Sequence, residues 1–168
     1  LFPDKENIRY QAELGGGALF DAGAYPIKVS QLMLGEDLKV EGASLWKDPA
    51  LGVDIWGGGF LKQRNGSLFT EIAFGFDHFY QCNIELWGSK GKLYTNRIFT
   101  ARPDFTPKII VETNDGSEAI SVEPDHHFRN FLTNFSVLVR GEKEKEFEYM
   151  QNVNQARLLE EFKKVAIG

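Results

Sequence analysis

Three side chains with acid–base chemistry follow a run of glycines near the start of the sequence. Asp21, Tyr25 and Lys28 come shortly after glycines 15–17. On a helix that turns by about 100° per residue, the three lie within about 40° of one another, so one face carries a carboxylate, a phenol and an amine. Such a set can give, take or orient protons, but a tyrosine (reference pKa ~10) is a base only where a cation stabilises its phenolate. A solvated polar face is the alternative that the spacing leaves open.

The segment 15–34 is predicted to be a helix that ends at Gly35, a common C-terminal stop. Pro26 lacks a backbone donor and clashes with the preceding turn, which predicts a kink or a regular helix that begins only near Gly23. The arc opposite the polar stripe is apolar and predicts the core face of the helix. Its residues are Leu19, Ala22, Pro26, Ile27, Val29, Met33 and Leu34.

The glycine run 15–17 predicts a place where the backbone comes close to another group, such as a ligand, or needs a positive φ. A free helix N-terminus at this point would favour an anionic group. The run is not a dinucleotide-binding fingerprint, because it lacks the G-x-G-x-x-G spacing and no strand leads into it.

From Lys39 onward the sequence is rich in β-branched and aromatic residues separated by turn signals. Asn65-Gly66 is typical of a two-residue hairpin turn, because both residues tolerate positive φ. Asp77-His78 and Asn114-Asp115-Gly116 indicate two more turns, and such short connections predict an antiparallel meander. The predicted strands are 40–46, 53–63, 67–76, 79–87, 92–96, 108–113 and 119–123.

Two helices, 125–139 and 151–166, are predicted after the strands, with Asp125 as the N-cap of the first. An N-terminal segment, 1–13, precedes the glycines, and its residues 8–12 are expected to be extended. The order predicts an α+β fold, an open and mainly antiparallel sheet of about six strands with helices packed on one face. Aromatic strand residues are assigned to the core by default, with sugar stacking or a subunit interface as alternatives. They are Trp56, Phe60, Phe74, Phe76 and Phe79.

The composition is that of one ordinary globular domain of 168 residues, 42% hydrophobic and 26% charged. The net charge of −5 argues against nucleic acid as a partner, and no run approaches the ~20 apolar residues of a membrane span. Cys82 is the single cysteine, which excludes an intrachain disulfide and favours a reducing cytoplasm. Three histidines with one cysteine do not form a zinc constellation, so no metal site is predicted.

The stretch "NIRYQAELGGGALFDAGAYPI" resembles the start of the C-terminal domain of the glucose–fructose oxidoreductase / inositol dehydrogenase family (Gfo/Idh/MocA). These enzymes typically show an Arg shortly before GGGxLxDxGxH or GGGxLxDxGxY. The resemblance continues, in order, through "IELWGSKGKL", "DHHFRNFLTNF" and "NQARLLEEF", and so covers nearly the whole chain. The Tyr form is similar to glucose–fructose oxidoreductase, dihydrodiol dehydrogenases and sugar-nucleotide ketoreductases.

The resemblance implies an NAD(P)-dependent dehydrogenase or ketoreductase that acts on a hydroxyl or ketone of a sugar or sugar nucleotide. It assigns Tyr25 as the acid/base, because hydride transfer at such a group needs a proton donor or acceptor. Asp21 is then a second carboxylate that orients the substrate or polarises the site. Arg9 matches the family's upstream Arg and would hold a substrate oxyanion, and Lys28 would contact a substrate hydroxyl or phosphate. For Arg9 and Lys28 a solvated side chain remains the alternative.

The resemblance also implies that NAD or NADP is bound mainly by an N-terminal Rossmann domain, with Gly16 and Gly17 passing close to the cofactor. Residues 1–168 contain neither that domain nor its Glu-Lys-Pro lysine motif. We therefore expect a cytoplasmic C-terminal substrate and oligomerisation domain, separated from its Rossmann domain and inactive alone. It would form a homodimer or tetramer through the open sheet face. A non-catalytic ligand-sensing or protein-binding member of the family is the alternative, and an independent carbohydrate-binding domain is a third.

Overall fold

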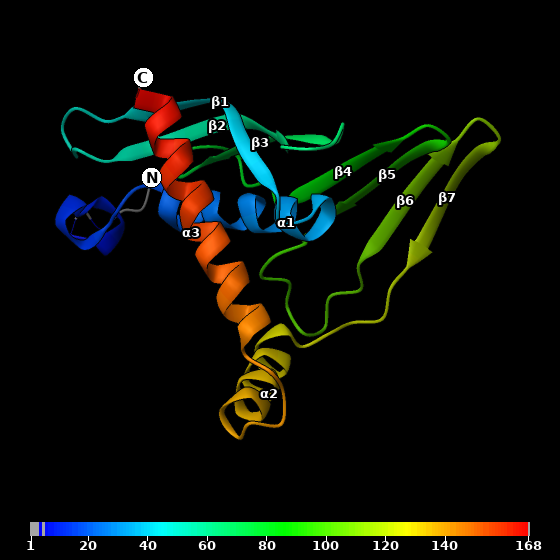
Figure 1. The fold of residues 1–168 in the computed structure, drawn as a ribbon. Helices are drawn as coiled ribbons and strands as arrows, with labels where there is room; N and C mark the ends of the chain where they lie inside the picture. Colours follow the sequence, from blue (N-terminus) through cyan, green and yellow to red (C-terminus); the bar gives the residue numbers. More distant parts are fainter. Residues whose placement is uncertain (1–3, 5, 168) are drawn as a thin grey trace. The chain divides into compact units, whose positions relative to one another are not determined.

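The computed structural model describes Asp4 and residues 6–167, which form two compact units. Unit 1 is Leu1–His78 together with Lys145–Gly168, and unit 2 is Phe79–Glu144. Along the chain, unit 1 contains three short helical turns, a helix, three strands and the last helix (Figure 1). These are η1 (Ile8–Tyr10), η2 (Ala12–Leu14), the π-helical turn η3 (Leu19–Gly23), α1 (Ala24–Leu34), β1 (Leu38–Lys47), β2 (Asp54–Gln63), β3 (Phe69–Gly75) and α3 (Glu146–Ile167).

The expected extended conformation of residues 8–12 is wrong. Ile8–Tyr10 and Ala12–Leu14 are 3₁₀ turns. The first turn is capped by Asn7, whose Oδ1 accepts a hydrogen bond from the backbone N–H of Arg9. Because an Asn side chain can hold a turn in this way, local capping outweighs the strand-like residues that follow.

In unit 1 the strands form an antiparallel sheet in the order β1-β2-β3, as the short connections predict. The β2–β3 hairpin is present, but its turn is not the expected two-residue Asn65-Gly66 turn. The backbone N–H of Gln63 donates to the carbonyl of Leu68 over 3.0 Å, which leaves a four-residue loop, and neither Asn65 nor Gly66 has a positive φ. Asn65 is held instead by Asp37, to which its side-chain amide donates.

The core of unit 1 lies where α1 and α3 pack against the same sheet (Figure 1). Along β2, Leu61 is buried in this core and the ring of Phe162 in α3 lies against Gly59. Ile55, on the same strand, is buried in a second, smaller cluster with Tyr10 and Val53. Full burial of such a side chain contributes about 1.5–3 kcal/mol, so the larger cluster is the main source of stability in this unit. Its buried members are Leu19, Ile27, Leu38, Val40, Leu61, Ile72, Leu158, Leu159 and Phe162.

The even-numbered residues of β2 project from the opposite face of the sheet, because side chains alternate along a strand. On that face Trp56 stacks on Trp46 with ring centroids 6.1 Å apart, and Phe60 meets Phe69 at 5.1 Å. Trp46, Trp56 and Phe69 are all exposed there, so the face is aromatic and uncovered within unit 1.

The default assignment of aromatic strand residues to the core is therefore only partly confirmed. Phe74 packs against the core through Phe162, and Phe76 contacts buried Tyr10 edge-on. Trp56 is 39% exposed and Phe79 is 91% exposed, so neither belongs to the core. Phe79 lies in the irregular segment that follows β3 instead of in a strand.

The helix after the glycines has two parts, a π-helical turn and α1. This confirms that the regular helix begins near Gly23, and Pro26 lies in the first turn of α1, where a missing N–H is least costly. Met33, expected in the core, is 54% exposed, whereas Ser30 and Gln31 are buried. The helical wheel starts from Asp21 and assumes an α-helical angle throughout. A π turn advances by a smaller angle per residue, so the predicted core face is rotated from the real one.

Unit 2 contains a second antiparallel sheet, in the order β4-β5-β6-β7, and one helix. Its sheet contains two tight hairpins: Gly88 pairs with Gly91, and Thr113 pairs with Gly116. The second has Asn114-Asp115 at its turn, as predicted. Asp77-His78 is not a hairpin turn, since β3 and β4 belong to different sheets. The elements are β4 (Asn83–Gly88), β5 (Gly91–Asn96), β6 (Lys108–Thr113), β7 (Gly116–Ser121) and α2 (His127–Val139).

The N-cap of α2 is His126, not Asp125 as expected. The Nδ1 atom of His126 accepts from the N–H of Arg129 at 3.3 Å. Asp125 instead accepts from the side-chain amide of Asn130 and from the N–H of His126. His126 thus has a structural role as the cap of α2.

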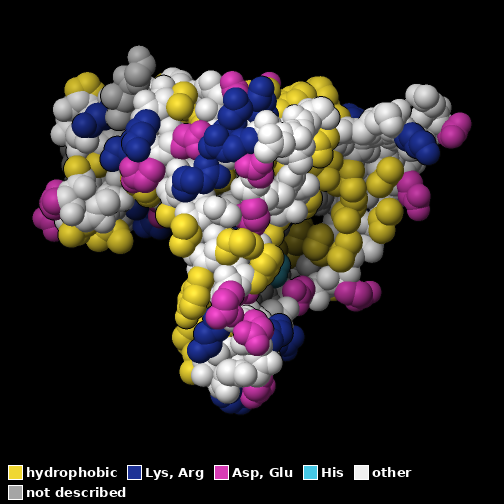
Figure 2. All heavy atoms as spheres, viewed as in Figure 1, with side chains coloured by type: hydrophobic (Ala, Val, Ile, Leu, Met, Phe, Trp, Pro, Cys, Tyr) yellow, Lys and Arg dark blue, Asp and Glu magenta, His cyan; other side chains and the backbone are white. Residues whose placement is uncertain are grey.

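The α+β class with mainly antiparallel strands is confirmed, and the strands are divided between a sheet of three and a sheet of four. Over unit 1, basic and acidic side chains lie next to one another (Figure 2), and several are ion-paired, such as Arg157 with Glu161 at 2.9 Å. Among the described residues, none of the helices combines the length and apolarity needed to cross a bilayer.

Candidate active site

Arg9 and Asp21 form an ion pair at the start of the glycine–helix segment. The Nε of Arg9 donates to Oδ2 of Asp21 over 2.9 Å, and the two side chains are 35% and 37% exposed. Asn7 supports the pair, because its Oδ1 also accepts from Nη1 of Arg9 at 3.4 Å. An ion pair that is about one-third exposed adds little to stability, so its main consequence is a fixed orientation of the Asp21 carboxylate.

The glycine run lies against the chain's own backbone. The N–H of Gly16 donates to the carbonyl of Gln11 and the N–H of Gly17 to the carbonyl of Arg9, each over 2.9 Å. A Cβ on Gly16 would lie 2.7 Å from the carbonyl oxygen of Arg9, which is closer than real contacts allow. The expected close approach therefore exists, and within the described residues it is made to Arg9, Gln11 and Asp54.

Asp54, the first residue of β2, is a site residue that the sequence does not indicate. Its Oδ2 accepts from the backbone N–H of Leu19 over 2.6 Å, across 35 positions of sequence. A carboxylate at a helix N-terminus satisfies an otherwise unpaired donor and interacts favourably with the helix dipole. The N–H of Leu19 is thus already bonded, which corrects the expectation of a free helix terminus that would favour an anionic ligand.

Tyr25 lies in the first turn of α1, four residues after Asp21, and its side chain is 47% exposed. Tyr25 therefore lies at the surface of unit 1, on the helical segment that also carries Asp21. Gln155 of α3 donates to the carbonyl of Ala24 over 2.9 Å, which fixes this turn against the last helix.

Lys28 is held by α3. Its Nζ donates to Oε1 of Gln151 over 2.8 Å, and Gln151 is only 8% exposed. The bond places the ammonium group against the neighbouring helix and favours a role in packing over the expected contact with substrate. The structure thus brings together Arg9, Asp21 and the glycines, and gives Lys28 a separate partner.

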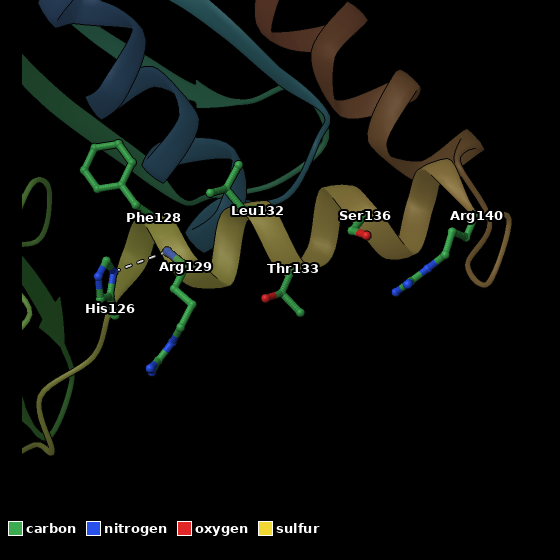
Figure 3. Close-up of a pocket in the computed structure, with 7 residues that line it drawn as sticks. All are labelled: His126, Phe128, Arg129, Leu132, Thr133, Ser136 and Arg140. Carbon is green, nitrogen blue, oxygen red and sulfur yellow. Dashed lines mark hydrogen bonds between the residues drawn. The ribbon is translucent and has the colours of Figure 1, made fainter.

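A surface groove of unit 2 offers a different candidate (Figure 3). Arg129, Thr133 and Arg140 lie on one side of α2, with Phe128 and Leu132 on the other (Figure 3). All its lining residues come from this single helix and its two caps, His126 and Arg140, and they include none of the predicted site residues. The polar groups on unit 1 are the better candidate, because they converge from several elements. The groove is lined by His126, Phe128, Arg129, Leu132, Thr133, Ser136 and Arg140.

The acid–base groups of unit 1 are suited to proton transfer at an exposed surface. Tyr25 supplies a phenolic O–H, and Asp21 supplies a carboxylate whose direction is set by Arg9. The described residues contain no group of three His, Cys, Asp or Glu side chains that is placed to hold a metal ion.

Comparison with known proteins gives a consistent result. A family model for the GFO/IDH/MocA C-terminal domain matches residues 2–94. A dTDP-3,4-didehydro-2,6-dideoxy-alpha-D-glucose 3-reductase from Actinomadura kijaniata is 35% identical over 92% of this chain and 46% of its own. The enzyme of the same name from Streptomyces antibioticus is 34% identical over 95% of this chain and 49% of its own.

A solved structure extends the likeness to the fold. A 3-ketoreductase from Actinomadura kijaniata, in complex with NADP and TDP-benzene, superposes with a TM-score of 0.88 at 34% identity. The match covers 94% of this chain and 48% of that protein. The present chain therefore spans about half the length of these relatives.

Proposed function

The chain belongs to the GFO/IDH/MocA family, and from this premise we propose that residues 1–168 are the C-terminal domain of an NADP-dependent reductase of sugar-nucleotide ketones. The observation that carries the proposal is the Arg9–Asp21 ion pair on the segment that also presents Tyr25. The likeness to reductases of dTDP-linked keto sugars gives the substrate class.

In this proposal Tyr25 gives a proton to the carbonyl oxygen of the substrate as hydride reaches the carbonyl carbon. The reduced nicotinamide supplies that hydride when it is bound. Asp21 orients the substrate through its fixed carboxylate, and Arg9 acts through Asp21, since its guanidinium is bonded to Asp21 and Asn7. A positioned acid of this kind contributes roughly 10²–10⁴-fold to the rate.

The glycine turn does not fit a phosphate cradle. Its N–H groups at Gly16 and Gly17 are bonded to backbone carbonyls, and that of Leu19 to Asp54. We therefore place the binding of the dinucleotide phosphates in a Rossmann domain outside these residues, with the turn passing close to the cofactor at most. In this proposal the chain contributes the proton donor, Tyr25, and the residues that orient the substrate.

We further propose that a second copy of the protein covers the aromatic sheet face of unit 1. The stacked pair Trp46–Trp56 and the pair Phe60–Phe69 lie on the side of the sheet opposite α1 and α3. Exposed apolar patches of this kind mark association surfaces. A sharp monomer mass by light scattering at tens of micromolar would count against the dimer.

The function is tested with the whole protein that contains this chain. We expect NADPH oxidation that depends on a dTDP-linked keto sugar, and little or none with the same sugar lacking the nucleotide. Calorimetry on residues 1–168 should show no tight NADPH binding, and tight binding would overturn the domain assignment. Tight sugar-nucleotide binding without turnover would favour the non-catalytic alternative.

A further inference from the structure

Gly17 is the junction between the two halves of the Arg9–Asp21 pair. Its N–H donates to the carbonyl of Arg9 over 2.9 Å, and its own carbonyl accepts from the N–H of Asp21 over 3.2 Å. Both side chains of the ion pair are therefore attached to backbone that is bonded to this one residue. A shift of Gly17 would move both partners.

Asp54 fixes that junction from the sheet. Its Oδ2 accepts from the N–H of Leu19, and its Oδ1 occupies the space where a Cβ on Gly17 would be. Gly17 is buried and has a φ of +120°, a conformation that favours glycine. One carboxylate from β2 thus contacts the glycine turn and caps the π-helical turn that carries Asp21.

We propose that Asp54 is a positioning residue for the Arg9–Asp21 pair: it holds the glycine turn in place and sets the direction of the Asp21 carboxylate. Its effect on turnover rests on the proposed function, whereas its effect on the order of the turn does not. A misplacement of about 1 Å at a reacting centre can lower a rate up to 10²-fold. We therefore expect loss of Asp54 to lower kcat and to leave the affinity for substrate nearly unchanged.

Asp48 provides a matched control. It lies in the β1–β2 connection, and its Oδ1 accepts from the N–H groups of Ala50 and Leu51 at 2.7 and 3.0 Å. It has the same charge as Asp54 and also makes carboxylate–backbone bonds, but all those bonds are local to its own turn. Asp48→Ala therefore measures what loss of such a carboxylate does in general.

The test uses three variants of the whole protein: Asp54→Ala, Asp54→Asn and Asp48→Ala. Amide hydrogen exchange of residues 16–22 is measured without substrate, and kcat and KM are measured with NADPH and a dTDP-linked keto sugar. We expect Asp54→Ala to speed exchange in 16–22 about tenfold, because the N–H of Leu19 loses its partner. It should also lower kcat about tenfold with KM within about threefold.

Asp54→Asn keeps a side chain of the same length with one oxygen acceptor. Its exchange rate in residues 16–22 and its kcat should both lie within about threefold of the wild type. Asp48→Ala should change neither. Exchange within twofold of the wild type in Asp54→Ala, or an equal loss in Asp48→Ala, would overturn the proposal. If the wild-type protein has no reductase activity, the proposed function is wrong. The amide hydrogen exchange of residues 16–22 then still shows whether Asp54 holds the turn.

Discussion

The two units share a strand topology and differ in what covers their sheets. Both are antiparallel meanders, but in unit 1 α1 and α3 pack against one face of the sheet. All the buried core residues lie in unit 1. No residue of 79–144, a segment that the structure describes in full, is buried.

The difference shows that strand pairing and a packed core are separate properties. Unit 2 has its full ladder of backbone bonds, yet Trp87 in β4 is 83% exposed and Phe131 in α2 is 64% exposed. Unit 1 has a core, and there tertiary contacts such as Asp54–Leu19 fix side-chain directions near the glycine turn. A positioned acid–base group needs such support, which is why we place the site on unit 1.

The largest expected effect is on catalysis, which should depend on a tyrosine of unit 1 and not on one of unit 2. In the whole protein, Tyr25→Phe removes one oxygen and keeps the ring, so kcat should fall about 10²–10⁴-fold while KM changes much less. Asp21→Asn should cost less, because its proposed role is orientation. Tyr94→Phe in β5 of unit 2 is the control and should keep kcat within about threefold. A Tyr25→Phe variant within that range would remove Tyr25 from the mechanism.

The next largest effect is on stability, which should depend more on a core ring of unit 1 than on an exposed ring of unit 2. Phe162→Ala opens a cavity in the core of unit 1, where Phe162 contacts Phe74, and should lower the free energy of unfolding by about 3–5 kcal/mol. Phe131→Ala in α2 removes an exposed ring and should change it by less than about 0.5 kcal/mol. Guanidinium unfolding of the whole protein measures both. An equal loss of stability for Phe131→Ala would show that α2 is buried in the whole protein, and the contrast between the two units would then be wrong.

A smaller effect compares two glycines with positive φ. Gly17→Ala combines a φ of +120° with a clash against Asp54, whereas Gly116→Ala, at +142°, meets nothing within 4 Å. Strained φ values cost roughly 1–3 kcal/mol each, so both variants should unfold at lower denaturant, with the greater loss for Gly17. Equal losses would mean that the Asp54 contact adds nothing to the strain.

The smallest effect concerns ion pairs on the two sheets. A hydrogen bond from Lys39, together with Lys62, lowers the pKa of Glu41 below its ordinary value of 4.5. A lowered carboxyl pKa stabilises the folded state above pH 4.5, and the contribution is lost as the pH falls through the folded-state pKa. Thermal scans of Glu41→Gln should therefore show a slight loss at pH 7 that vanishes in acid and in high salt.

Lys92 in unit 2, which lies between Glu85 and Glu112, supplies the comparison. Lys92→Gln should be as mild as Glu41→Gln, because exposed pairs are weak on either sheet. A marked loss for Lys92→Gln alone would show that unit 2 depends on surface charge where unit 1 depends on its core.

Local patterns in the sequence were enough to identify most elements. The hairpin at Asn114-Asp115-Gly116, the antiparallel strands and the start of the regular helix near Gly23 all follow from turn chemistry, alternation and the position of Pro26. The motif around glycines 15–17 also indicates the family that the comparisons identify. These features depend on neighbours within a few residues, so the sequence alone contains them.

The division into two sheets and the geometry of the site were decided by tertiary structure. Asp54 reaches Leu19 across 35 positions, and Lys28 reaches Gln151 across 123. No periodicity connects residues so far apart, and the π turn Leu19–Gly23, which contains Asp21, changes the phase that a helical wheel assumes. The sequence determined which acid–base groups lie on the helix segment, while packing decided which partners orient them, because only the folded chain brings distant residues together.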